Sequence, residues 1–229
     1  MFRLRRAEST DDPAEAPPDA PDADLDPEAR HDERLIRAAQ AGDLPSFNAL
    51  VVRHERSVYN LCLRMLRDVS SAEDATQDTF LKAWTAIATF QGGLVRPWLL
   101  RIATNRCYDV LRARSRRPAD SLDAEEFESE PVWTSQAPAG EHPEAFAARA
   151  ELSVHLERAL ATLPEDQRLV VILSDVHGHP YDEIADITGV AVGTVKSRLS
   201  RARARLRDAL RDDPAAGELF ARFARFSED

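Results

Sequence analysis

The sequence predicts an all-α protein, with two small helical domains joined by a flexible acidic linker. Apolar residues recur at three- and four-residue spacing in several segments, which is the period of an amphipathic helix. Two stretches rich in acids and proline interrupt this pattern. Each helical part then closes on a run of basic residues. A length of 229 residues is enough for one or two domains with sizeable cores.

The net charge of -10 is unevenly distributed along the chain. Residues 7–30 hold nine acids and one arginine, and residues 118–148 hold eight acids and neither lysine nor arginine. These stretches also contain nine of the 14 prolines. Proline lacks a backbone donor and like charges repel, so neither stretch should pack into a core. We therefore predict a disordered tail over residues 1–31 and a linker over 118–143.

Two other segments are strongly basic. Residues 92–117 carry seven arginines against one aspartate, and residues 193–211 carry one lysine and six arginines against one aspartate. Such a stripe is the electrostatic signature of phosphate binding, although a single one is more often a solvated helix face. Two stripes, each closing its own folded segment, favour nucleic-acid binding over that alternative.

Composition excludes several other classes of protein. Cys62 and Cys107 are the two cysteines, and no Cys/His cluster is present, so neither a disulfide scaffold nor a metal site is expected. The six histidines form no ligand pattern, which argues against a helical nuclease; we expect no catalytic residues and no cofactor. No apolar run could cross a membrane, and the first residues lack the apolar core of a secretory signal, so a cytoplasmic location is expected.

The first domain is predicted over residues 32–117. One amphipathic helix has its apolar face at Phe47, Leu50, Val51, His54, Val58, Leu61, Cys62 and Met65, which makes His54 and Cys62 core residues. After a break at residues 68–71, a helix over 72–89 is expected, with Ser70 or Ser71 as its N-cap. The face of this helix opposite its core is acidic with one exposed apolar side chain: Asp74, Gln77, Asp78 and Leu81.

A third helix is predicted over residues 97–114. Gly92 and Gly93 break the chain before it, and Pro97 suits the first helical turn. One face of this helix carries the polar residues Arg101, Asn105, Asp109 and Arg112. Arginine and asparagine bond base edges and phosphates, while Trp98 could either stack on unpaired bases or belong to the core. Together these features favour single-stranded over duplex DNA.

The second domain is predicted over residues 144–211. A helix over 144–162 and an apolar segment over 165–175 precede a short helix over 181–188, a turn at Gly189 and a basic helix from Val192 or Gly193. This order is that of a helix-turn-helix, whose second helix enters the major groove, although apolar faces alone would fit any small bundle. Base edges should meet Lys196, Ser197, Ser200 and Arg201, and phosphates should meet Tyr181, Thr194, Arg198 and Arg203.

Three segments carry a resemblance to a known family: AEDATQDTFLKAW at 72–84, RPWLLRIATNRCYDVLR at 96–112, and LPEDQRLVVILSDVHGHPYDEIADITGVAVGTVKSRLSRARARL at 163–206. In this order, the sequence resembles the extracytoplasmic-function class of sigma-70 factors over residues 33–117 and 144–210. The resemblance implies a non-catalytic specificity subunit of RNA polymerase, with a region 2 domain and a region 4 helix-turn-helix domain.

The resemblance also implies partners and residue roles. Core RNA polymerase would be bound at its β′ clamp helices by Asp74, Gln77, Asp78 and Leu81, and at its β-flap by the second domain. The -10 element of promoter DNA would be held as a single strand by Gln91, Arg96, Trp98, Arg101, Asn105, Arg106, Asp109 and Arg112. The duplex -35 element would be read by the helix-turn-helix residues named above. An anti-sigma factor is an expected partner, and the acidic linker would thread near the polymerase's nucleic-acid channels.

Two features fall outside the shared pattern. The loop over residues 90–95 departs from the family's usual sequence, so Gln91 is chosen there as the contact to a flipped base. In the extension over 212–229, Leu219, Phe220, Phe223 and Phe226 have helical spacing and could either pad the second domain or dock a partner. A conventional helix-turn-helix repressor using residues 163–210 alone is the main rival, but it leaves the basic helix over 97–114 unexplained.

Overall fold

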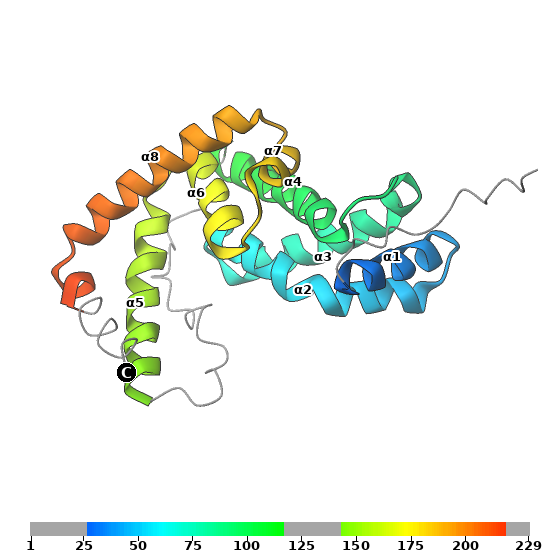
Figure 1. Ribbon diagram of the computed structural model, residues 1–229, viewed down its shortest axis with the longest axis horizontal. Coiled ribbons are helices and arrows are strands. Elements are labelled where there is room, and N and C mark those ends of the chain that lie inside the picture. Colours follow the sequence, from blue (N-terminus) through cyan, green and yellow to red (C-terminus); the bar gives the residue numbers. More distant parts are fainter. Residues whose placement is uncertain (1–26, 117–142, 219–229) are drawn as a thin grey trace, which may run out of the picture.

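The computed structural model describes residues 27–116 and 143–218, and every element in these ranges is a helix (Figure 1). The all-α prediction is therefore confirmed. Helices α1 to α4 form the first domain and α5 to α8 the second. Most of the predicted acidic tail and linker, and residues 219–229 of the extension, lie outside the described residues.

The first domain packs α2 against α1, α3 and α4. Its elements are α1 (Pro27–Gln40), α2 (Leu44–Leu66), α3 (Val69–Ala86), the short 3-10 helix η1 (Ile87–Thr89) and α4 (Val95–Arg116). The apolar face predicted for α2 is buried, including His54 and Cys62, except that Val51 is half-buried. The Nε2 atom of the buried His54 ring lies 2.7 Å from the Asp32 carboxylate oxygen Oδ2. This hydrogen bond gives a polar ring in the core its partner.

Helix boundaries differ from the predictions at three places. Residues 27–31, assigned to the tail from sequence, form the first turn of α1. The N-cap of α3 is Asp68 rather than Ser70 or Ser71, because the Asp68 carboxylate accepts a hydrogen bond from the Ser71 backbone N–H at 2.7 Å. Helix α4 begins at Val95, so Arg96 belongs to the helix and not to the preceding loop.

The Asp68 cap predicts a stability effect. Hydrogen bonds from Ser71 lower the pKa of Asp68, so the carboxylate's contribution is present above its unfolded pKa and is lost as the pH falls through the folded value. Asp68→Ala should reduce the free energy of unfolding by about 1 kcal/mol at pH 7, measured by urea denaturation. Asp68→Asn, which keeps a capping oxygen, should lose much less. Equal losses in the two variants would contradict the capping role.

The second domain contains the predicted helix-turn-helix. Its elements are α5 (Pro143–Ala161), α6 (Glu165–Val171), a π-helical turn η4 (Ile172–Val176), α7 (Tyr181–Thr188) and α8 (Val192–Arg211). Gly189 ends α7 with a φ of 70°, a left-handed conformation that favours glycine, and its N–H bonds the Ala185 carbonyl. This tight turn sets α8 against α6 and α7 through Val195, Leu199 and Ala202.

The two domains are in direct contact. The buried Arg168 of α6 donates to the carbonyls of Leu160, Ala161 and Leu163 at the end of α5. Its Nη1 atom also donates to the Met65 carbonyl in the last turn of α2, at 3.0 Å. One guanidinium therefore satisfies carbonyl groups at the ends of two helices from different domains.

The described part of the extension packs on the second domain. Ala216 is fully buried, and the Asp213 carboxylate accepts from the backbone N–H of Ala215 and from the ring of His155 on α5. This favours padding over partner docking for residues 212–218. The apolar residues from Leu219 onward lie outside the described residues.

Candidate nucleic-acid interface

Helix α4 presents the predicted polar face to solvent. Arg101, Asn105, Asp109 and Arg112 are all exposed, at successive turns of the helix. Leu99, Leu100, Ala103 and Cys107 on the other side are buried in the core of the first domain. The packing of α4 therefore fixes a row of base- and phosphate-bonding side chains on the surface.

The loop before α4 is shaped by two glycines. Gly92 and Gly93 have φ values of 107° and 92°, so side chains are disfavoured at both positions. Gln91 is exposed beside them, and Trp98 packs its ring against Phe90 with centroids 5.2 Å apart. A hollow of about 190 Å³ opens here, lined by Gln91, Trp98 and Arg101 together with Asp186 and Ile187 of α7. Trp98 is half-buried, so it both packs and remains accessible.

The acidic strip of α3 lies on the surface, as its spacing predicted. Asp74 and Gln77 are exposed, and Leu81 keeps 66 % of its surface in solvent. Asp78 is half-buried and forms an ion pair with Arg106 of α4 at 2.7 Å. Sequence reasoning had assigned Asp78 to polymerase and Arg106 to DNA, whereas the structure joins the two side chains to each other.

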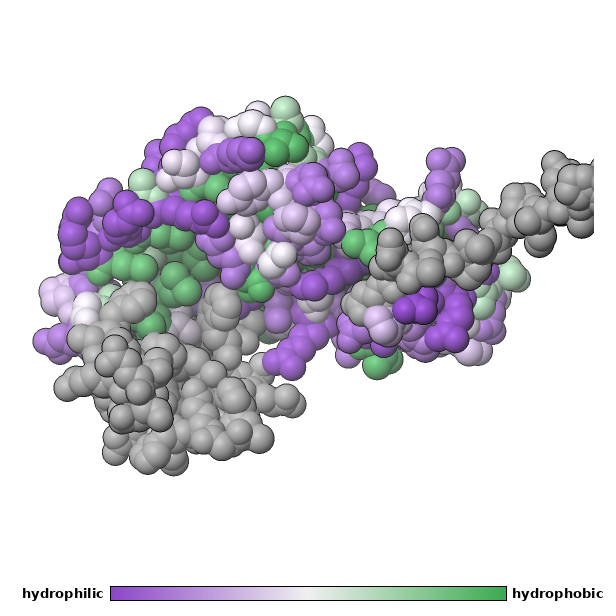
Figure 2. All heavy atoms as spheres, in the orientation of Figure 1, coloured by the Kyte–Doolittle hydropathy of each residue, from purple (hydrophilic) through white to green (hydrophobic). Residues whose placement is uncertain are grey.

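Half of the residues predicted for duplex DNA are exposed, and all of the exposed ones lie on α8. Lys196, Ser200, Arg201 and Arg203 are exposed, and Figure 2 shows hydrophilic residues along this helix. Tyr181, Thr194, Ser197 and Arg198 are half-buried. The Arg201 guanidinium donates to the Ser197 hydroxyl at 3.3 Å, and Lys196 lies in the N-terminal half of α8.

Both arginines of α8 that were predicted to contact phosphates are already engaged within the domain. Arg198 pairs with Asp166 of α6 at 3.0 Å, and Arg203 forms an ion pair and a second hydrogen bond with Asp175. The Asp175 carboxylate raises the pKa of Arg203 above its ordinary value. These contacts hold the Arg198 guanidinium against Asp166 of α6 and the Arg203 guanidinium against Asp175 of η4.

Both domains of the chain match known protein families. Residues 50–117 match the family model for sigma-70 region 2, and residues 153–206 match the model for sigma-70 region 4, together covering more than half of the chain. The RNA polymerase sigma-H factor of Pseudomonas aeruginosa is 35% identical over 184 residues, which span 78% of this chain and 93% of the relative. The ECF RNA polymerase sigma-E factor of Escherichia coli K12 is 37% identical over 75% of this chain and 90% of its own. The chain belongs to the extracytoplasmic-function class of sigma-70 factors.

Solved structures of sigma factors share the fold. CnrH, solved in complex with the cytosolic domain of CnrY, matches with a TM-score of 0.59 and 27% identity over 80% of this chain and 99% of its own. The sigma factor RpoE of Bartonella quintana, solved with the anti-sigma factor NepR, matches with a TM-score of 0.57 and 32% identity over 74% of this chain and 99% of its own.

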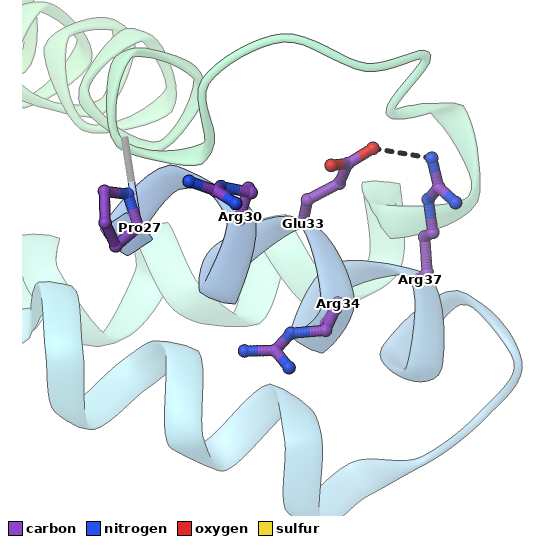
Figure 3. A pocket seen from close by; sticks show the side chains of 5 residues that line it. All are labelled: Pro27, Arg30, Glu33, Arg34 and Arg37. Carbon is purple, nitrogen blue, oxygen red and sulfur yellow. Dashed lines mark hydrogen bonds and ion pairs between the residues drawn. The ribbon is translucent and has the colours of Figure 1, made fainter. Parts of the chain in front are cut away.

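A basic surface of this sigma factor was missed from sequence. Arg30, Arg34 and Arg37 are exposed on α1 and, with Pro27 and Glu33, line a hollow of about 490 Å³ (Figure 3). Gln40 fixes α1 to the loop before α4 by donating to the carbonyls of Ile87 and Phe90. The charge count did not reveal this cluster, because many acids precede it in residues 7–30. The spacing of four and then three residues between the arginines could have indicated that they share one helix face.

Within residues 27–116 and 143–218, no three His, Cys, Asp or Glu side chains gather where they could hold a metal ion. In the same ranges, no helix is both long and apolar enough to cross a bilayer.

Proposed function

We propose that this sigma factor binds core RNA polymerase through α3, holds the -10 element as a single strand on α4 and its preceding loop, and reads the -35 element as duplex with α8. The main support for this proposal is that the protein has two separate exposed basic faces, one on α4 and one on α8. A repressor using the helix-turn-helix alone would have no use for the face on α4.

The proposal assigns residues to each role. Polymerase binding falls to Asp74, Gln77 and Leu81, with Asp78 acting partly through its ion pair to Arg106. Contacts to the -10 strand fall to Gln91, Arg96, Trp98, Arg101, Asn105, Arg106, Asp109 and Arg112. Contacts to the -35 duplex fall to Tyr181, Thr194, Lys196, Ser197, Arg198, Ser200, Arg201 and Arg203.

The chain's other properties follow from these roles. It works in the cytoplasm as a specificity subunit without catalysis of its own, and polymerase aligns its two domains on the promoter. An anti-sigma factor is a proposed partner, because the matching RpoE was solved in complex with one. The domain limits proposed are 32–117 for region 2 and 144–211 for region 4, with α1 extending region 2 to Pro27.

Run-off transcription tests the function directly. Core polymerase, this chain and a library of promoter fragments should yield transcripts whose start sites share upstream -35 and -10 sequences, and these transcripts should be absent without the chain. Tight duplex binding by the chain alone, without transcripts in the presence of core enzyme, would instead support the repressor. A gel shift with and without core polymerase separates the two outcomes.

A further inference from the structure

Region 4 sits on the part of region 2 that faces the -10 strand. Helix α7 packs along α4, and the turn after η4 reaches α2. Besides the Arg168 contact, Arg64 of α2 pairs with Glu157 of α5 at 3.0 Å, with the Arg64 side chain almost fully buried. The contact therefore includes buried charged groups with specific partners rather than a loose apolar touch.

Arg96 lies at the centre of this contact. Its Nε atom donates to the Ser57 hydroxyl of α2 at 3.2 Å, and its Nη2 atom lies 3.1 Å from Nδ1 of His177 and 3.4 Å from the His177 carbonyl. Because a guanidinium only donates hydrogen bonds, Nδ1 of His177 must be the acceptor and carries no proton. The side chain proposed to contact the -10 strand is thus held by region 4.

Helix α7 also closes one side of the hollow beside the -10 loop. Asp186 and Ile187 of α7 line that hollow together with Trp98 and Arg101. A single strand that entered it to stack on Trp98 would have to displace α7. Asp186 and Arg101 line the same hollow, so a strand in it would bring its phosphates close to the Asp186 carboxylate.

We propose that, in the chain without polymerase, α7 and the His177 turn occupy the -10 strand's surface on region 2, so that region 4 and single-stranded DNA compete for Arg96, Trp98 and Arg101. This inference rests on the proposed function for the identity of the competing ligand. Both domains belong to one chain and meet at an effective concentration on the order of mM, so a contact of modest strength suffices to keep the closed form populated.

The closed form is sensitive to acid because of His177. A proton on Nδ1 would place a donor and a positive charge against Arg96, and Nε2 is buried without a partner among the described residues. Other charged or titratable groups near the ring are Arg64 on α2 and His179, which Glu183 of α7 holds. Burial and the charge of Arg96 lower the pKa of His177 to about 3.

The direction of the pH effect follows from this shift. Opening returns His177 to an ordinary pKa of about 6.5, so the closed form is fully favoured above that value and loses ground as the pH falls below it. At pH 5.5, the ratio of open to closed chain should rise about tenfold relative to pH 7.5. His177→Gln, whose amide oxygen can still accept from Arg96, should stay closed and lose most of this pH dependence.

Two variants open the contact without touching residues that bind DNA. His177→Ala removes the acceptor for Arg96, and Asp186→Arg puts a positive charge beside Arg101. Asp182→Arg is the matched control, because Asp182 is exposed on the same helix but does not line the hollow. Spin labels on Val52→Cys and Ala204→Cys report the separation of the domains; both positions are exposed, whereas Cys62 and Cys107 are buried and escape labelling.

Electron-paramagnetic distance measurements on the labelled full chain should give one short-distance population for the parent and for Asp182→Arg. Longer, broader distances are expected for His177→Ala and Asp186→Arg, and for the parent at pH 5.5. In fluorescence anisotropy with a random 20-nucleotide single-stranded DNA, the two opened variants should bind about fivefold or more tightly than the control, since at least one cationic contact is released.

Each outcome decides the proposal. A parent chain that is already extended at pH 7.5 would overturn it, as would opened variants that bind the single strand no more tightly than Asp182→Arg. Run-off transcription by the parent shows whether the proposed function itself has failed. If the parent initiates transcription but shows no masking, the proposed function stands and the closed form is wrong. Short parent distances, longer variant distances and tighter single-strand binding together would support the masked surface.

Discussion

Replacing Lys196 and Arg201 together by alanine is expected to remove promoter-specific initiation while leaving polymerase binding intact. Both side chains are exposed in the N-terminal half of α8, and the N-terminal part of a recognition helix is the part that meets base edges. Each base contact is worth about 1–3 kcal/mol, so the double variant should lose roughly a hundredfold or more in specific initiation. Run-off transcription measures this loss, and pull-down of core polymerase should be unchanged.

Arg207→Ala is the matched control for this experiment. Arg207 is also exposed on α8 but lies eleven residues beyond Lys196, about 16 Å along the helix axis. Its loss should weaken DNA binding uniformly across sequences by removing at most a phosphate contact. If Arg207→Ala reduced promoter selectivity as much as the double variant, α8 would not read the -35 element with its N-terminal half.

The core of each domain could be predicted from sequence because it depends on local periodicity. The buried residues of α2 and α8 repeat at helical spacing, and burial is the only arrangement that removes such a stripe from water. The position of Asp68 as a cap was not predicted, because Asp68, Ser70 and Ser71 each offer a capping oxygen within one short stretch. Only the backbone direction at Val69 decides among them.

The contact between the domains could not be predicted from local patterns. Arg96 and His177 are separated by 81 positions, and neither carries a sequence signal that points to the other. Arg168 shows the same limit: a buried arginine in an apolar segment is satisfied by carbonyls at two helix ends. Such partners depend on how whole helices are placed, and periodicity within one helix contains no information about this placement.

The candidate surfaces were predicted more fully than their internal contacts. On α3, α4 and α8, one face of each helix is buried in the core, so the polar residues on the opposite face can be predicted to be exposed. The ion pairs of Asp78 with Arg106 and of Arg198 with Asp166 cross from one helix to another, so residue spacing did not show them. They change how variants must be chosen, because replacing Asp78 also releases Arg106.

Replacing Asp74 by arginine together with Leu81 by alanine is expected to weaken the polymerase complex strongly while sparing the fold. Both side chains are exposed on α3, so the change reverses one charge and removes one apolar contact without opening the core. Asp78→Arg is the less clean variant, since it would also set a positive charge against Arg106 of the -10 face. A tenfold or larger loss of affinity, about 1.4 kcal/mol or more, is expected in a pull-down or anisotropy titration with core polymerase.

Glu55→Arg controls for the charge change, because Glu55 is exposed on α2 and is not part of the strip on α3. It should bind polymerase like the parent chain. The Asp74→Arg, Leu81→Ala variant should also keep the parent's free energy of unfolding, since the strip contributes nothing to the core. If a folded variant bound polymerase with unchanged affinity, polymerase would not bind this face of α3. The side chain of Leu81, which is 66 % exposed, would then need another binding partner.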